Sequence, residues 1–150
     1  MADEPLKLSI RDAEDLAVMS SIVQDALTRA RDMAFQERER RFLVLLDRFM
    51  WERDDGVRGA GKLHNRVRSV LHFDDVSGVQ TLNIDLAAQD EVLNLLAVTQ
   101  SSEGSAHVDL VFAGGGIIRL NVGCIECRLA DQGSPWVTRR RPEHRLDTTD

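Results

Sequence analysis

The sequence contains two cysteines, Cys124 and Cys127, in the motif Cys-Ile-Glu-Cys. This spacing is typical of dithiol redox centres and of pairs of zinc ligands. A redox pair needs an activated first thiol, and Cys124 would be activated in the first turn of a helix beginning at Val122. The intervening glutamate opposes this chemistry because its charge raises a thiol pKa, and zinc would need two more ligands, such as His107 and His144. Buried cysteines that pack as small apolar side chains are the alternative.

Residues 56–62 read Gly-Val-Arg-Gly-Ala-Gly-Lys and match the pattern of a phosphate-binding loop. In such a loop backbone N–H groups hold the phosphates, and Lys62 would reach the β and γ oxygens. The next residue is Leu63, where the pattern has the Ser or Thr that binds magnesium, and the preceding residues 52–55 are all charged. The sequence therefore favours a mobile glycine-rich loop over residues 53–65.

Charged side chains occur within and directly after the apolar segment 42–51. Consecutive strand residues point to opposite faces, so Asp47 and Arg48 cannot both face solvent if both faces of the sheet are covered. Arg48, near Trp51, would suit an anionic ligand or the carboxylate of a partner. We predict Arg48, Trp51 and Glu52 as ligand- or partner-binding residues, and the alternative for Arg48 is an internal ion pair.

Two further motifs have simple structural interpretations. The glycines at 114–116 could let a ligand approach the backbone, but a hairpin turn with positive φ explains them. The arginines at 139–141 and 145 could dock a partner or RNA, whereas a solvated tail is the simpler interpretation. The sequence shows no H-x-x-x-H motif and no recognisable Ser/His/Asp grouping, so it predicts no catalytic residue and no cofactor.

A period of two around the three glycines predicts the central hairpin of the fold, over residues 107–128. Val108, Leu110 and Phe112 are spaced by two before the turn, and the same spacing of apolar residues continues after it. This pattern is typical of paired β-strands with one buried face.

The remaining elements follow from the same periodicities. Strands are expected at residues 6–10, 42–51, 67–73 and 79–84, and a helix from Ala13 to about Gln24. Asp12 is the expected N-cap of this helix. Residues 28–35 could form another strand, which would pair with 42–51 around an exposed charged turn at 36–41. A turn is expected at 74–78.

Two segments are ambiguous. Residues 92–99 are apolar and fit either a helix or a strand. Residues 122–131 also fit both, and a short helix is favoured because Asn121 could cap it. Ile125 and Leu129 are four residues apart, and a glycine stands at position 133, where a helix C-terminus would need one.

A shift of 75 residues aligns the two halves of the chain. It places residues 20–23 on 95–98 and residues 43–45 on 118–120. Both halves would then read strand, helix or turn, strand and hairpin, which raises the hypothesis of an internal pseudo-twofold repeat. The alternative is that any two β-rich halves of similar length align as well as these.

The composition limits the classes of protein to which this chain can belong. The 150 residues are 43% hydrophobic and 29% charged, as in an ordinary globular domain. The net charge of −6 argues against nucleic-acid binding, since phosphate contacts need a basic surface. Two cysteines are too few for a disulfide framework, and neither a secretory signal nor a membrane-spanning apolar run is visible. We therefore expect a soluble cytoplasmic protein with no membrane partner.

These patterns predict an α+β fold, in which a mostly antiparallel β-sheet built from hairpins carries one or two packed helices. Residues 1–137 are expected to form a single domain. The polar residues 138–150 are expected to form a disordered tail.

Three segments resemble those of a family of short bacterial proteins known only as a domain of unknown function. They are residues 12–26, 41–52 and 111–131, and the second reads Arg-Phe-Leu-Val-Leu-Leu-Asp-Arg-Phe-Met-Trp-Glu. The resemblance covers nearly the whole chain and implies a compact bacterial domain. It implies no activity, so no functional residue is carried over.

The leading functional hypothesis is a non-enzymatic binding or assembly module. Its edge strands would offer contacts to a second copy, as in a homodimer, or to a protein partner. The rival is a small thiol-redox or metal-dependent enzyme that uses Cys124 and Cys127. Partner capture that depends on Arg48 or Trp51 would support the first, and loss of metal or redox chemistry on replacing both cysteines with Ser would support the second.

Overall fold

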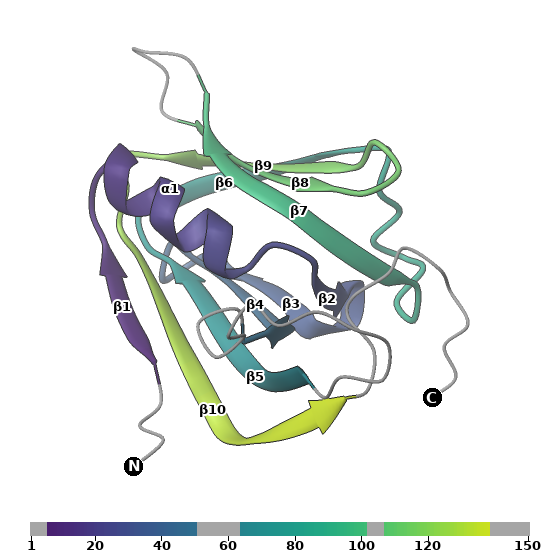
Figure 1. Cartoon of the computed structure of the whole chain (residues 1–150). Coiled ribbons are helices and arrows are strands. Elements are labelled where there is room, and N and C mark those ends of the chain that lie inside the picture. Colours follow the sequence, from purple (N-terminus) through teal and green to yellow (C-terminus); the bar gives the residue numbers. More distant parts are fainter. Residues whose placement is uncertain (1–5, 51–63, 102–106, 139–150) are drawn as a thin grey trace.

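The computed structural model describes residues 6–50, 64–101 and 107–138, and in these residues it shows a curved antiparallel sheet with one α-helix packed against it (Figure 1). The strands are β1 (Lys7–Ile10), β2 (Ala26–Arg29), β3 (Met33–Gln36), β4 (Arg41–Phe49), β5 (His64–Phe73), β6 (Val76–Leu82), β7 (Val92–Gln100), β8 (His107–Phe112), β9 (Ile117–Val122) and β10 (Cys127–Thr138). The helix is α1 (Ala13–Ile22), and a short 3₁₀ helix, η1 (Ala30–Asp32), separates β2 from β3. The predicted mostly antiparallel α+β fold is confirmed.

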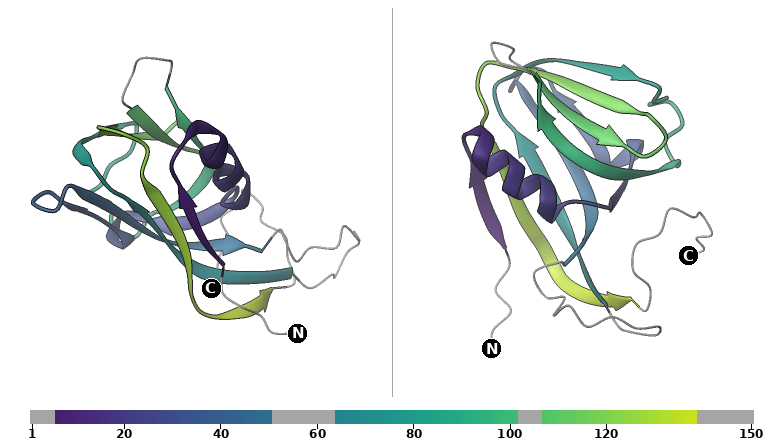
Figure 2. Two further views of the ribbon diagram at one scale, coloured as in Figure 1. Left: turned by 90° about the vertical axis from the view of Figure 1, so that its left-hand side faces the viewer. Right: turned by 45° about the horizontal axis from the view of Figure 1, so that its top comes forward.

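The described strands form one sheet, in the order β1-β10-β5-β4-β2-β7-β8-β9-β6. Strand β2 links two halves, because it pairs with β7 over four residues but with β4 only between Leu27 and Asp47. Strand β3 continues along the same edge of β4, from Met33 to Gln36. The half-sheet β7-β8-β9-β6 therefore folds over the half-sheet β1-β10-β5-β4, as Figure 2 shows.

The core lies between the two half-sheets, because alternate residues of each strand point inward. Along β4 the inward residues Phe42, Val44 and Leu46 are buried. Leu110 of β8 and Leu120 of β9 are buried on the facing half-sheet and belong to the same apolar cluster. This is why the chain reads as short apolar runs with a period of two.

Helix α1 packs against β1 and β7 and covers the open side of the core between them (Figure 1). Asp12 caps the helix by accepting a hydrogen bond from the N–H of Asp15 at 2.8 Å, which confirms the predicted N-cap. The helix buries Met19 against the sheet. The hydroxyl oxygen of Ser20 accepts a hydrogen bond from the N–H of Val98 at 2.8 Å and so fixes the helix to β7. Within the described residues, no helix has the length and apolarity that a membrane crossing requires.

The prediction of a helix over residues 122–131 is wrong. Val122 is the last residue of β9, and Cys127 begins β10, which pairs with β1 on one side and β5 on the other. These long-range hydrogen bonds decide the conformation, since two apolar residues four apart fit either period over so short a stretch. Gly133 has a φ of 71° and lies where β10 shifts its register, not at a helix end.

The ambiguous segment 92–99 forms strand β7. Residues 95–98 are therefore strand, whereas residues 20–23, aligned with them by the shift along the chain, belong to α1 and its C-cap. The pseudo-twofold repeat is consequently not shown. The alignment by 75 residues placed helical residues on strand residues, because short apolar segments have similar sequences whether they form a helix or a strand.

Two loops differ from their predicted extents. Strand β6 already begins at Val76, because Asp74 and Asp75 alone redirect the chain after β5, with Asp75 at a φ of 58°. Strand β5 begins at His64, so the end of the predicted mobile loop is strand. The rest of that loop and most of the predicted tail lie outside the described residues.

Candidate functional site

Arg48, predicted as a binding residue, lies on the inner face of β4 with 0% of its surface exposed. Its guanidinium donates two hydrogen bonds to Asp131 of β10, from Nε to Oδ1 and from Nη2 to Oδ2, both at 3.0 Å. This paired geometry matches a planar guanidinium to a carboxylate. The structure therefore shows the internal ion pair that was the alternative interpretation of Arg48.

Asp131 accepts two more hydrogen bonds, from the hydroxyl of Ser69 at 2.7 Å and from the backbone N–H of Leu6 at 3.0 Å. Burial alone raises the pKa of Asp131, but the hydrogen bonds from Arg48, Ser69 and Leu6 outweigh it and hold this pKa below its usual range. The network joins β4, β5 and β10 to the residue before β1. Trp51 and Glu52, the other two predicted binding residues, lie outside the described residues.

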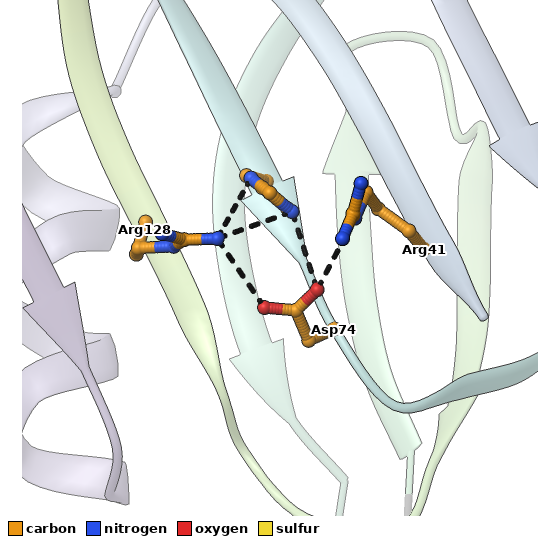
Figure 3. Close-up of polar contacts among 4 residues, drawn as sticks. Arg41, Asp74 and Arg128 are labelled. Carbon is orange, nitrogen blue, oxygen red and sulfur yellow. Dashed lines mark hydrogen bonds and ion pairs between the residues drawn. The ribbon is translucent and has the colours of Figure 1, made fainter. Parts of the chain in front are cut away.

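A second polar cluster lies on the outer side of the sheet, beside the turn that leads from β5 to β6 (Figure 3). We call it the junction cluster, and it consists of Arg41 of β4, His72 of β5, Asp74 after β5 and Arg128 of β10. Oδ1 of Asp74 accepts hydrogen bonds from Nε of Arg41 at 3.4 Å and from Nε2 of His72 at 3.2 Å. Nη2 of Arg128 lies 3.6 Å from its other oxygen. The cluster holds three neighbouring strands together at their ends.

The surroundings of His72 favour its neutral form. Nη2 of Arg128 lies 3.3 Å from Nδ1 and 3.5 Å from Nε2 of His72, so it contacts the ring and not one nitrogen alone. Nε2 lies 3.2 Å from Oδ1 of Asp74 and donates to it, since a carboxylate only accepts. Desolvation above all, with the charges of Arg128 and Arg41, lowers the pKa of His72 despite the nearby carboxylate. The hydrogen bond to Asp74 and the contact with Arg128 make His72 part of the junction cluster.

We expect His72 to make the protein less stable as the pH falls below about 6.5. Its pKa is lowered on folding, so between the two pKa values the unfolded chain binds protons that the folded chain does not. The stability of the neutral form is fully present above the unfolded pKa and is lost as the pH falls through this window. Urea unfolding at about pH 7.5 and 5.5 measures it. The decrease should be smaller in His72→Gln, and an equal decrease in both proteins would contradict the assignment.

The two cysteines lie in different environments. Cys124 is exposed in the turn between β9 and β10, and Cys127 is buried at the start of β10. Desolvation, a hydrogen bond at 3.6 Å to Asp75 and the charges of Asp75 and Glu126 raise the pKa of Cys124. Burial above all raises the pKa of Cys127. Both thiols are therefore protonated at neutral pH, which does not favour thiolate chemistry, and the redox or metal role remains a prediction.

Replacing Cys127 with Ser is expected to destabilise the protein by about 1–3 kcal/mol, because a hydroxyl would be buried where the thiol packs among apolar residues. Cys124→Ser is the matched control, since the same change at an exposed site should cost less than about 0.5 kcal/mol. Denaturant unfolding measures both. Equally small losses of unfolding free energy in both variants would show that Cys127 does not stabilise the protein by packing, and would favour a role in thiol chemistry.

The other motifs add no site within the described residues. The loop 56–62 and the arginines after residue 138 lie outside them. In the part of the chain that the structure describes, no group of three or more His, Cys, Asp or Glu side chains is arranged to hold a metal ion.

The open edge of the sheet at β6 was not located by sequence analysis. Among the described residues, β6 pairs with β9 on one side and with no strand on the other, and Figure 2 shows it at the margin of the sheet. Its sequence Val-Ser-Gly-Val-Gln-Thr-Leu has no charged residue and no proline, the residues that commonly protect edge strands. Among the described strands, β1 and β3 also pair on one side only, but each has just four residues, and β1 carries the exposed Lys7. We call the unpaired side of β6 the β6 edge.

An apolar row crosses the outer face of the same half-sheet and ends at the β6 edge. Ala97 of β7 pairs with Val111 of β8. Val111 pairs with Ile117 of β9, and Ile117 pairs with Leu82 of β6. Cross-strand partners share a face, and this row faces outward because the adjacent Leu110 is buried in the core. Leu82 is 58% exposed, so the row presents apolar surface next to the unpaired edge.

The glycine-rich turn between β8 and β9 positions the end of β6. Gly114 and Gly115 both have a φ of 89°, which confirms the predicted turn with positive φ. A Cβ on Gly116 would lie 2.6 Å from Cγ1 of Ile84, so glycine is needed for Ile84 to pack this closely. The side chain of Asn83 donates a hydrogen bond to the carbonyl oxygen of Gly115 at 3.4 Å. The glycines therefore hold the chain after β6 against the hairpin.

The fold and the site together define a small α+β protein with a buried ion-pair network and an open, uncharged edge strand. The chain belongs to the family described as Protein of unknown function (DUF2948), whose model matches residues 6–144. This confirms the resemblance to a family of unknown function. Neither a curated protein nor a solved structure matches the chain.

Proposed function

We propose that this protein is a non-enzymatic binding and assembly module that takes up a partner strand along the β6 edge. The observation that carries the proposal is that β6, a strand of seven uncharged residues, has no strand on one side among the described residues. The unpaired N–H and C=O groups of such an edge are satisfied when an extended segment of a partner adds to the sheet.

The apolar row supplies the second part of the interaction. Each added main-chain hydrogen bond contributes about 0.5–1.5 kcal/mol, and buried apolar surface contributes about 25 cal/mol per Å². Leu82 lies both on β6 and at the end of the row, so a strand that adds to the β6 edge also covers apolar surface. A partner with apolar side chains on the matching face is therefore preferred.

The polar groups of the described chain support a binding role over catalysis. Arg48 and Asp131 neutralise each other in the core, and His72 and Asp74 are bonded to each other in the junction cluster. The two free cysteines fit a reducing, cytoplasmic setting, which belongs to the same proposal together with the expected bacterial origin. The net charge of −6 fits a protein partner better than nucleic acid.

Site-specific photo-crosslinking in the producing cells tests the proposal. Gln80, which is exposed in the middle of β6, is replaced by benzoylphenylalanine, and Lys7 on the edge strand β1 is replaced in the same way as the control. We expect an adduct through position 80 but not through position 7. A second change, Thr81→Lys, should remove the adduct because it places a charge on the edge.

The fold of each variant is checked by circular dichroism and thermal unfolding. A well-folded protein that forms no adduct through position 80, or one that crosslinks equally through positions 7 and 80, would overturn the proposal.

A further inference from the structure

We infer that the strand that adds to the β6 edge is β6 of a second copy of this chain, paired antiparallel about a twofold axis at Gln80. This inference rests on the proposed function and names its partner. A twofold interface uses the same surface on both copies, so it requires an edge that is complementary to itself in geometry, side chains and charge. Each of these three conditions follows from described residues.

The first condition is the length of β6 that is free to pair. The N–H of Val76 donates a hydrogen bond of 2.8 Å to the carbonyl oxygen of Arg40, so the first residue of β6 is already engaged outside its pairing with β9. The register shifts between Val76 and Gly78. At the other end Asn83 has a φ of 57°, which ends the extended conformation. The free segment therefore runs from Gly78 to Leu82, and its middle residue is Gln80.

The second condition is that the side chains match across the axis. When Gln80 faces Gln80 of the second copy, Leu82 faces Gly78, and Val79 faces Thr81. Glycine has no side chain, so the exposed Leu82 can lie over Gly78 of the second copy without a clash. The apolar row of each copy is then extended across the interface. The two central amides can hydrogen-bond to each other, since each has both donors and an acceptor.

The third condition is charge. The Gly78–Leu82 segment is uncharged, so no like charges oppose each other along it. At the Val76 end the side chain of Arg40 is paired with Asp75 at 3.2 Å, whereas the exposed Asp85 follows the last residue of β6 by three positions. Antiparallel pairing places the two copies of Asp85 at opposite ends of the interface, whereas parallel pairing would place them side by side. The charge of Asp85 therefore favours the antiparallel, twofold arrangement.

Disulfide trapping tests the register directly. Directly opposed residues of an antiparallel pair have Cα atoms about 4.5–5.5 Å apart, within the range that a disulfide spans. In a Cys124→Ser background, Gln80→Cys should therefore form a covalent dimer under mild oxidation. Thr99→Cys, at an exposed position on β7 and away from the edge, is the matched control. We expect the position-80 dimer to form at least about tenfold faster, and to be slowed by Thr81→Lys.

Sedimentation of the unmodified protein over a range of concentrations completes the test. A monomer–dimer equilibrium that Thr81→Lys shifts to monomer supports the inference. A monomer at every concentration, with position 80 oxidising no faster than position 99, overturns it.

The experiments distinguish failure of this inference from failure of the proposed function. If benzoylphenylalanine at position 80 forms adducts with another protein while the unmodified chain stays monomeric, strand addition stands and the second copy is refuted. If position 80 forms no adduct of either kind, both are refuted.

Discussion

Replacing Asp131 with Asn is expected to lower the free energy of unfolding by about 3–5 kcal/mol. The change keeps the shape of the side chain and removes its charge, so the guanidinium of Arg48, which is 0% exposed, loses the carboxylate with which it is paired. Arg48 is not exposed to water that could compensate, and removing one partner of a buried ion pair is strongly destabilising. Urea or guanidinium unfolding measures the loss.

The matched control is Asp90→Asn, the same chemical change in the exposed ion pair with Arg31, where the cost should be about 0–1 kcal/mol. The double variant Arg48→Met with Asp131→Leu should recover most of the loss, because it removes both buried charges together. If Asp131→Asn costs no more than the control, the pair does not carry the stability assigned to it.

The ion pair of Arg48 and Asp131 also makes the stability of the protein depend on pH in the acid range. The pKa of Asp131 is lowered on folding, so its contribution is present above the unfolded value of about 3.9 and is lost as the pH falls through the folded value.

Met19→Ala is expected to cost about 2–5 kcal/mol, the range for truncating a large buried side chain. Met19 is 0% exposed and lies on the face of α1 that covers the open side of the core. In the described residues α1 is the only α-helix, so no neighbouring helix can move into the space that the truncation leaves. Thermal or denaturant unfolding should show the loss as a shift of the whole transition.

Val18→Ala on the same helix is the control, because Val18 is 55% exposed and alanine has the higher helix propensity. It should change the stability by less than about 0.5 kcal/mol. Comparable losses at positions 18 and 19 would contradict the prediction, because the cost would then not follow the burial of the two side chains.

The sequence indicated only one of the two residues of the buried ion pair. Arg48 stood out because it interrupts an apolar strand, but its partner was missed. Asp131 follows Cys127 and Leu129 at a spacing of two, and all three are buried along β10. Once residues 122–131 are treated as a strand and not as a helix, this spacing puts a carboxylate on the buried face, where it needs a cation.

The junction cluster and the β6 edge were missed for a different reason. His72 and Arg128 are 56 positions apart and face each other only because β5 pairs with β10. The lack of charge along β6 is a local feature, but a strand becomes an edge only through the order of the whole sheet.

Local pattern was sufficient for the central hairpin with its glycine turn, for helix α1 with its Asp12 cap, and for the strand character of most segments. Each of these depends on interactions within a few residues, or on a period that the buried face imposes on the chain. Which strands pair, which edge stays open and which charges meet depend on contacts between residues far apart in the chain. The tertiary structure alone decided that Arg48 meets Asp131, that residues 127–138 are a strand, and that β6 is left with one side unpaired among the described residues.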